Sequence, residues 1–206
     1  MFILGIIPAR GDSRGIPNKN IYPLCGKPMI EYTIEAAEES MLDDWLVFTD
    51  KYFQYKNYGI TEPKEFAYSS SWKIEFSQYC VNEYEKKYNK VDAVMLLQPT
   101  SPLRTAEDIN KAIAYFKKYQ YSGWNSLYSG YNMRIKHKEK LDSKENGDFH
   151  FQRNGAIFIT KIDLLNKGKL WDKVIEYQMP KSRSIDVDDM DDFYIVESIL
   201  KNPRRS

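Results

Sequence analysis

The chain has 206 residues, of which 30 are Lys or Arg, 29 are Asp or Glu, 42% are hydrophobic and two are Cys. This near-neutral balance argues against the positive field of a nucleic-acid-binding protein, and two cysteines are too few for a disulfide framework or a cysteine metal site. No apolar run approaches the roughly 18–20 residues of a membrane span, and residues 1–9 lack the basic start of a signal peptide. We expect one domain over residues 1–206, in the cytoplasm, with neither a membrane nor a nucleic-acid partner.

The first half of the chain alternates predicted strands and helices. Residues 2–7 are continuously apolar, which is typical of a strand buried on both faces of a parallel sheet. In chain order, periodicity and proline position then predict a helix at about 28–40, a strand at 46–49, a helix at 72–88 with an aromatic or Cys side chain every four residues, and a buried strand at 91–97.

The second half is less regular. Thr105 and Asp108 resemble a capping box at the start of a helix. Residues 123–151 are polar and rich in tyrosine and turn residues, which predicts hairpins or an exposed irregular excursion. Further strands are expected at 156–159, 174–179 and 184–187, before a terminal helix from about Asp189. This order predicts an α/β fold with a doubly wound, mostly parallel sheet, whose ligands bind at the carboxyl ends of the strands.

Two motifs carry candidate chemistry. The loop after the first predicted strand holds Arg10, Arg14 and Lys19, which together can oppose most of the charge of a triphosphate. It is neither a P-loop nor a dinucleotide fingerprint, so composition alone leaves a solvated surface loop open. Near the other end, Asp186 and Asp188 would share one face of a strand and meet one hard cation. The alternative is an acidic helix start, which suits the helix dipole.

Four segments, in the same order, closely resemble the CMP-N-acylneuraminate synthetases, cytidylyltransferases that activate sialic acid and related ulosonic acids. They are residues 6–37, which include the loop, 96–104 (LLQPTSPLR), 154–159 (NGAIFI) and 184–188 (SIDVD). The resemblance implies a sheet of the nucleotide-diphospho-sugar transferase type, CTP and a sugar-acid acceptor as substrates, and Mg²⁺ on Asp186 and Asp188. It is also compatible with a homodimer.

The same resemblance implies roles for individual residues. Catalysis is expected to rest on charge neutralisation and in-line positioning, because no histidine is placed to activate a serine or threonine nucleophile. The expected catalytic residues are Arg10, Lys19, Asp186 and Asp188. The expected nucleotide-binding residues are Arg10, Gly11, Asp12, Ser13, Arg14, Lys19 and Asn20, and the expected acceptor-binding residues are Gln98, Thr100, Ser101, Arg153 and Asn154.

The sequence departs from the family pattern in two regions. In residues 61–71, Glu62 and Ser69 stand where the family typically has an arginine and an aspartate, and Lys64 is the available substitute cation. Residues 123–151 are shorter than the family's excursion, which carries dimer contacts and cations for the sugar carboxylate. Arg134, Lys136 and Arg153 remain as candidates. We therefore expect the nucleotide half to be better preserved than the acceptor half, and N-acetylneuraminate to be a poor acceptor.

Three other functions stay open at this point. The first is a cytidylyltransferase for a different ulosonic acid, a smaller sugar acid or a phosphate. The second is a glycosyltransferase that holds a sugar nucleotide with Asp-x-Asp, although such a motif normally lies mid-chain and Asp186 lies near the end. The third is a non-catalytic nucleotide-binding relative, for which Glu62 and the short excursion argue. Pyrophosphate release from CTP discriminates among them.

Overall fold

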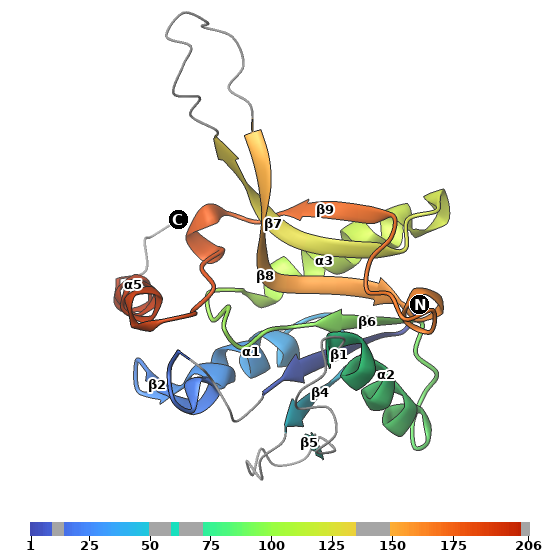
Figure 1. Ribbon diagram of the computed structural model, residues 1–206, viewed down its shortest axis with the longest axis horizontal. Coiled ribbons are helices and arrows are strands. Elements are labelled where there is room, and N and C mark those ends of the chain that lie inside the picture. The colour runs from blue at the N-terminus through green and yellow to red at the C-terminus, as the bar shows by residue number, and fades with distance from the viewer. Residues whose placement is uncertain (10–14, 50–58, 62–71, 135–148, 203–206) are drawn as a thin grey trace, which may run out of the picture.

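The computed structural model describes residues 1–9, 15–49, 59–61, 72–134 and 149–202 (Figure 1). These residues form a seven-stranded mixed sheet in the order β5-β4-β1-β6-β8-β7-β9 and a separate β2-β3 pair. The strands are β1 (Ile3–Pro8), β2 (Pro23–Leu24), β3 (Lys27–Pro28), β4 (Asp44–Thr49), β5 (Gly59–Thr61), β6 (Ala93–Leu96), β7 (Ser126–Arg134), β8 (Phe149–Lys161) and β9 (Val174–Gln178). The α-helices are α1 (Met29–Glu38), α2 (Trp72–Glu85), α3 (Ala106–Tyr119), α4 (Ile162–Leu165) and α5 (Met190–Lys201).

β1 is the centre of the parallel half of the sheet, with β4 on one side and β6 on the other. Ile3 and Ile7 pack into a cluster with side chains of α1 and α3, whereas Leu4 and Ile6 pack into a second cluster with side chains of α2. Alternate residues therefore serve opposite faces, which explains why this strand has no polar positions. The expected α/β fold, with a mostly parallel sheet covered by helices on both faces, is confirmed.

The other half of the sheet is built around β8. This strand pairs antiparallel with β6 and with β7, and β9 then adds parallel to β7 as the edge strand. The outer ends of β7 and β8 remain paired beyond the other strands (Figure 1). Of the two expectations for residues 123–151, the described part therefore shows the regular hairpin pairing. Residues 135–148, and Lys136 with them, lie outside the described residues.

A third apolar cluster joins the two ends of the chain below the carboxyl edge of the sheet. It contains residues of the N-terminal loop, β2, α1, the turn after β6, the segment before α5 and α5 itself, namely Ile16, Leu24, Met29, Leu103, Val187, Phe193 and Val196. The prediction of a strand at 184–187 is wrong, because this segment joins no sheet. Its backbone is held instead by the N–H of Val187, which donates to the carbonyl oxygen of Thr100 at 2.8 Å.

Two helices next to this cluster begin with capping boxes. In α3 the backbone N–H and hydroxyl of Thr105 both donate to Asp108, whose own N–H donates back to the hydroxyl, as expected. In α5 the side chain of Asp189 accepts from the N–H of Asp192, and the Asp192 carboxylate accepts in return. Among the helices of the described residues, none combines the length and the apolar character that crossing a bilayer requires.

Candidate active site

The N-terminal loop enters the site through Lys19 and Asn20, which are both buried at the start of a 3₁₀ turn, η1 (Lys19–Ile21). Five of the predicted nucleotide-binding residues lie outside the described residues: Arg10, Gly11, Asp12, Ser13 and Arg14. The structure therefore describes the predicted phosphate-binding stretch from Gly15 onward, and the role of the preceding five residues stays a prediction.

Lys19 connects this loop to the acidic segment at the other end of the chain. Its ammonium group donates to the carbonyl oxygens of Val187 at 2.8 Å and Asp188 at 3.0 Å, and lies 3.7 Å from Asp188 Oδ1. Gly15 packs against the same backbone, since a Cβ there would lie only 2.3 Å from the Asp188 carbonyl oxygen. Lys19 is therefore both a candidate phosphate ligand and a clamp on the segment that carries the two carboxylates.

The Asp186 carboxylate is the inner acid of this segment. Burial raises its pKa, a hydrogen bond from the Thr100 side chain lowers it, and the negative charge of Asp188 raises it again, with a raised pKa as the net result. Asp186 Oδ1 is buried and has no hydrogen-bond partner among the residues that the structure describes. A buried carboxylate oxygen without a donor is an unsatisfied ligand position, which a proton or a cation would satisfy.

Gly155 brings β8 close to this carboxylate. It has a φ of +72°, and a Cβ at this position would lie 3.2 Å from Asp186 Oδ2 and 3.2 Å from Gln98 Oε1. Gln98 lies two residues after the end of β6, at the carboxyl edge of the parallel strands, where side chains face ligands. The side chains of Gln98 and Asp186 thus converge, although the sequence places them 88 positions apart.

The two acids fit a magnesium ion. Mg²⁺ usually binds one or two protein carboxylates and fills its remaining positions with water and phosphate oxygens. Asp186 supplies a buried free oxygen, and Asp188, whose side chain is 82% exposed, lies close enough to raise the pKa of Asp186. In the described ranges no group of three or more His, Cys, Asp or Glu side chains is arranged to hold a metal. A site with two carboxylates is what these residues offer.

Arg104 holds the turn that follows β6. Its guanidinium group is buried and donates to the carbonyl oxygens of Gln98 at 3.1 Å and Ala156 at 2.9 Å, and to the hydroxyl of Thr33 at 2.7 Å. Burial lowers its pKa to about 9, against the attraction of Asp108. Ser101, predicted to bind the acceptor, is also buried in this turn, and its hydroxyl has no partner in the described part of the chain.

The other two predicted acceptor residues differ sharply in their surroundings. Asn154 is buried. Its side-chain oxygen accepts a hydrogen bond from the Ser129 hydroxyl at 2.6 Å, and its side-chain nitrogen donates one to the Ser184 hydroxyl at 2.9 Å. Asn154 therefore links β7 and β8 to the segment that leads to Asp186. Arg153 is exposed, with its guanidinium carbon 5.3 Å from the ring centroid of Tyr128 and 5.7 Å from that of Trp171. It lines a cavity of about 620 Å³, whose other lining residues are Tyr128, Asn132, His150, Phe151, Trp171, Val174 and Glu176.

Lys73 is a residue near the site that sequence reasoning missed. It lies in the first turn of α2, with its ammonium nitrogen 5.4 Å from the ring centroid of Phe158 in β8. Burial lowers its pKa, attraction to Asp186 raises it, and repulsion from Arg153 lowers it. It shows no helical or metal-ligand spacing in sequence, so only the packing of α2 on β8 reveals it. The departures Glu62, Lys64 and Ser69 lie outside the described residues.

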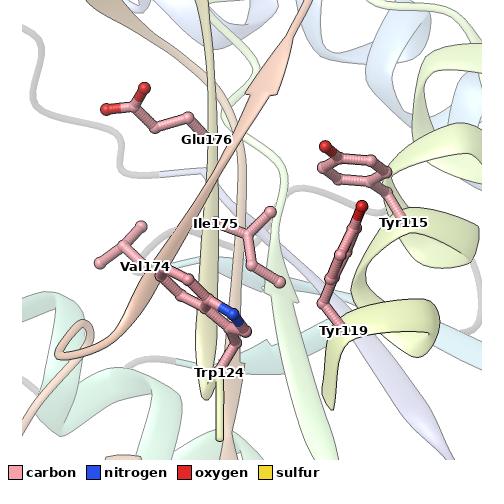
Figure 2. A pocket seen from close by; sticks show the side chains of 6 residues that line it. All are labelled: Tyr115, Tyr119, Trp124, Val174, Ile175 and Glu176. Atoms are coloured by element: carbon pink, nitrogen blue, oxygen red, sulfur yellow. The ribbon is translucent and has the colours of Figure 1, made fainter. Parts of the chain in front are cut away.

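A second cavity, of about 420 Å³, lies at the sheet edge between α3 and β9. Figure 2 shows Tyr115 and Tyr119 on the helix facing Ile175 of β9, with Trp124 below them and Glu176 pointing away. None of the residues that line it is a predicted site residue. We therefore place the candidate active site at the carboxyl edge of the sheet, around Asp186, and not here.

Comparison with known proteins decides the family. Residues 4–178 match the family described as cytidylyltransferase. The chain belongs to this cytidylyltransferase family. An N-acylneuraminate cytidylyltransferase of Escherichia coli is 29% identical over 98% of this chain and 53% of its own length. A CMP-N,N'-diacetyllegionaminic acid synthase of Legionella pneumophila is 34% identical over 57% of this chain and 54% of its own. The chain spans about half the length of these curated relatives.

A solved structure supports the fold independently. CMP:2-keto-3-deoxy-manno-octonic acid synthetase, solved in complex with CTP, superposes with a TM-score of 0.71 at 14% sequence identity, covering 98% of this chain and 99% of that one. At this identity the likeness shows the shared fold. The resemblance in the four sequence segments is thus confirmed as family membership for this cytidylyltransferase.

Proposed function

We propose that this cytidylyltransferase activates a sugar acid with CTP and releases pyrophosphate. The observation that carries the proposal is the buried, unpartnered oxygen of Asp186, beside Asp188 and beneath Gln98 at the carboxyl edge of the sheet. Such an arrangement would suit a Mg²⁺ ion held by Asp186 and Asp188, which would neutralise negative charge at the reacting phosphate. Family membership and the names of the relatives support the nucleotide and the class of acceptor.

The proposed reaction is a single in-line displacement. The acceptor hydroxyl oxygen forms a bond to the α-phosphorus of CTP, the bond from that phosphorus to the β-phosphate oxygen breaks, and pyrophosphate leaves while the hydroxyl proton passes to solvent. Asp186 and Asp188 would hold Mg²⁺, which supplies charge neutralisation at the reacting phosphate. Lys19, together with Arg10 and Arg14 from the same stretch of sequence, would hold the remaining phosphate charge.

Lys19 can bind a phosphate oxygen while it also holds the segment that carries Asp186 and Asp188. Its ammonium group already donates two hydrogen bonds to backbone carbonyls, which leaves one proton for a phosphate oxygen. Asn20, buried next to it, would face the nucleotide. On the opposite side, Gln98 and Thr100 would contact the acceptor, and the cavity beside Arg153 would take the body of the sugar.

The acceptor is the finer part of the proposal. We expect an acceptor that is smaller than N-acetylneuraminate or differently charged, because residues 123–151 are short compared with the family pattern. Relatives named for acylneuraminate, legionaminate and keto-deoxy-octonate are all represented among the similar proteins. In the family this region carries contacts between subunits, and we propose that this chain also forms a homodimer.

A pyrophosphate-release assay tests the function directly. The protein is incubated with CTP and Mg²⁺ and with each of three acids: N-acetylneuraminate, N,N'-diacetyllegionaminate and 2-keto-3-deoxy-manno-octonate. We expect pyrophosphate and a CMP-sugar with at least one acid, and a catalytic efficiency below about 10⁴ M⁻¹s⁻¹ with N-acetylneuraminate. Release of CMP or CDP from a CMP- or CDP-sugar instead would indicate a glycosyltransferase, and CTP binding without turnover would indicate a binding protein.

A further inference from the structure

Lys73 stands in a position that its own helix does not favour. It lies in the first turn of α2, where the helix dipole repels a cation, and the ring of Phe158 covers it. In the part of the chain that the structure describes, no hydrogen bond or ion pair within 4.0 Å holds its ammonium group. A cation placed against both the dipole and desolvation calls for a compensating anion.

The charges around Lys73 show where such an anion would lie. Asp186 attracts the ammonium group, and Arg153 repels it. The ring under Lys73 belongs to Phe158, which pairs with Leu96 two residues before Gln98 and follows Gly155, the glycine that packs against Asp186, by three residues. Lys73 therefore lies over the part of β8 that leads to Asp186. Asp186 also interacts with Lys19 of the N-terminal loop, so cations from two different elements, Lys19 and Lys73, attract this carboxylate.

The chemistry of 2-ulosonic acids places an anion at this point. In the ring form of these acids, the hydroxyl that attacks phosphorus and the carboxylate are bonded to the same carbon. The attacking oxygen must come within about 3–3.5 Å of the α-phosphorus, so the carboxylate is confined to the immediate neighbourhood of the metal. A cation close enough to Asp186 to be attracted by its negative charge meets this requirement. Arg153 is exposed, and its guanidinium carbon lies 5.3 Å from the ring centroid of Tyr128 and 5.7 Å from that of Trp171.

We infer that Lys73 binds the carboxylate of the acceptor and selects 2-ulosonic acids over neutral sugars. The inference rests on the proposed function. Lys73 would act as a substrate-binding residue, by pairing with the group adjacent to the nucleophile, while Arg153 meets a more distant part of the acceptor. Phe158 would keep water away from the pair and strengthen it.

The test combines a lysine variant with an acceptor variant. The wild-type protein, Lys73→Met and Lys73→Arg are assayed for pyrophosphate release with the acid on which the wild type is most active, and with the carboxamide of that same acid. We expect Lys73→Met to raise KM for the acid about 10- to 100-fold, the range for losing one hydrogen bond to a charged group, and Lys73→Arg to restore most of it. Lys86→Met, an exposed lysine just beyond the other end of α2, is the control and should leave KM within about twofold.

The carboxamide separates recognition from a general loss of structure. The wild type should prefer the acid to the amide by the same factor that Lys73→Met loses, and Lys73→Met should treat the two alike. An unchanged KM for the acid, or an equal slowing with acid and amide, would overturn the inference. So would a weakened affinity for CTP in calorimetry with no effect on the acid, which would place Lys73 on the triphosphate. No pyrophosphate from the wild type with any of the three acids would contradict the proposed function itself, and the inference with it.

Discussion

The nucleotide side and the acceptor side of the candidate site are built in opposite ways. On the nucleotide side, Lys19 is buried and bonded, Gly15 touches the backbone of Asp188, and a closed apolar cluster fixes the segment beneath both. On the acceptor side, Arg153 is exposed, and the cavity beside it is lined by aromatic rings and by polar side chains. Phosphoryl transfer demands one geometry, whereas acceptor choice tolerates variation. The described part of the nucleotide side is thus buried and hydrogen-bonded, whereas the acceptor side is open to solvent.

The largest loss is expected from the inner acid. Asp186→Asn keeps the side-chain shape but removes the anionic ligand, and should lower kcat by about 10²–10³, the usual cost of removing one transition-state stabilising group. Asp188→Asn should cost less, because that side chain is mostly exposed. Pyrophosphate release over a range of Mg²⁺ concentrations measures both, with circular dichroism to verify the fold. Full activity of both variants would remove the metal assignment.

The second effect is on stability and tests how firmly the approach to Asp186 is held. Arg183 pairs with buried Asp108 through two hydrogen bonds of 2.9 and 2.7 Å, just before the acidic segment. Arg183→Met would leave that carboxylate buried without its cation, and should reduce the free energy of unfolding by about 3 kcal/mol at pH 7. Chemical denaturation measures this, and Lys111→Met, which breaks an exposed pair in the same helix, should change it by less than about 0.5 kcal/mol.

The same pair predicts a dependence on pH. Burial alone would raise the pKa of Asp108, but hydrogen bonds from Arg183 and Thr105 outweigh it and hold the pKa below its ordinary value of 3.8. The stabilisation is therefore present above that value and is lost as the pH falls through the folded pKa. The difference between wild type and Arg183→Met should be smaller at pH 3 than at pH 7. A difference that grows toward low pH would contradict this account.

Substitution of Lys19 tests whether the nucleotide side binds the phosphates. Lys19→Ala should weaken CTP binding by about 10- to 100-fold, since a hydrogen bond to a charged group is lost, and should weaken CMP binding less. Calorimetric titration with both nucleotides measures the difference. Arg10→Ala is expected to behave likewise. Equal losses for CMP and CTP would place Lys19 away from the β- and γ-phosphates and leave it as a clamp on Val187 and Asp188 alone.

Gly155 tests the contact between the two sides. Gly155→Ala combines left-handed backbone with a Cβ 3.2 Å from the side chains of Asp186 and Gln98, whereas Gly168→Ala has nearly the same φ, +71°, with nothing within 4 Å. Both should lose about 1–2 kcal/mol of stability from the backbone alone. Only Gly155→Ala should also lower kcat, by about tenfold, because it displaces Asp186. Equal activity of the two variants would show that the approach of β8 does not position the acid.

The sequence predicts the nucleotide side of the site better than the acceptor side, for physical reasons. The buried strands, the capping box at Thr105 and the acidic start of the terminal helix follow from local patterns, so the sheet and the position of Gln98 at its edge could be predicted. The prediction of a strand at 184–187 is wrong because its apolar residues, Ile185 and Val187, pack into the third cluster and not against a sheet. The place of Lys73 depends on a contact between α2 and β8, and the cavity beside Arg153 depends on residues of β7, β8 and β9 that meet only in the folded sheet. No local sequence pattern records either.

The smallest effect is expected at Arg153, on the open side. Its guanidinium group is exposed and already stacked on Tyr128 and Trp171, so any acceptor anion that it meets is also solvated. Screened contacts of this kind contribute about 1 kcal/mol, so Arg153→Met should raise KM for the preferred acid by about fivefold and leave KM for CTP unchanged. Lys181→Met is the matched control, since Lys181 is also exposed and lies 5.8 Å from the ring of Tyr131 outside the cavity. A loss at Arg153 as large as that at Lys19 would mean that the acceptor side closes over its ligand, and the contrast between the two sides would then hold only for the free protein.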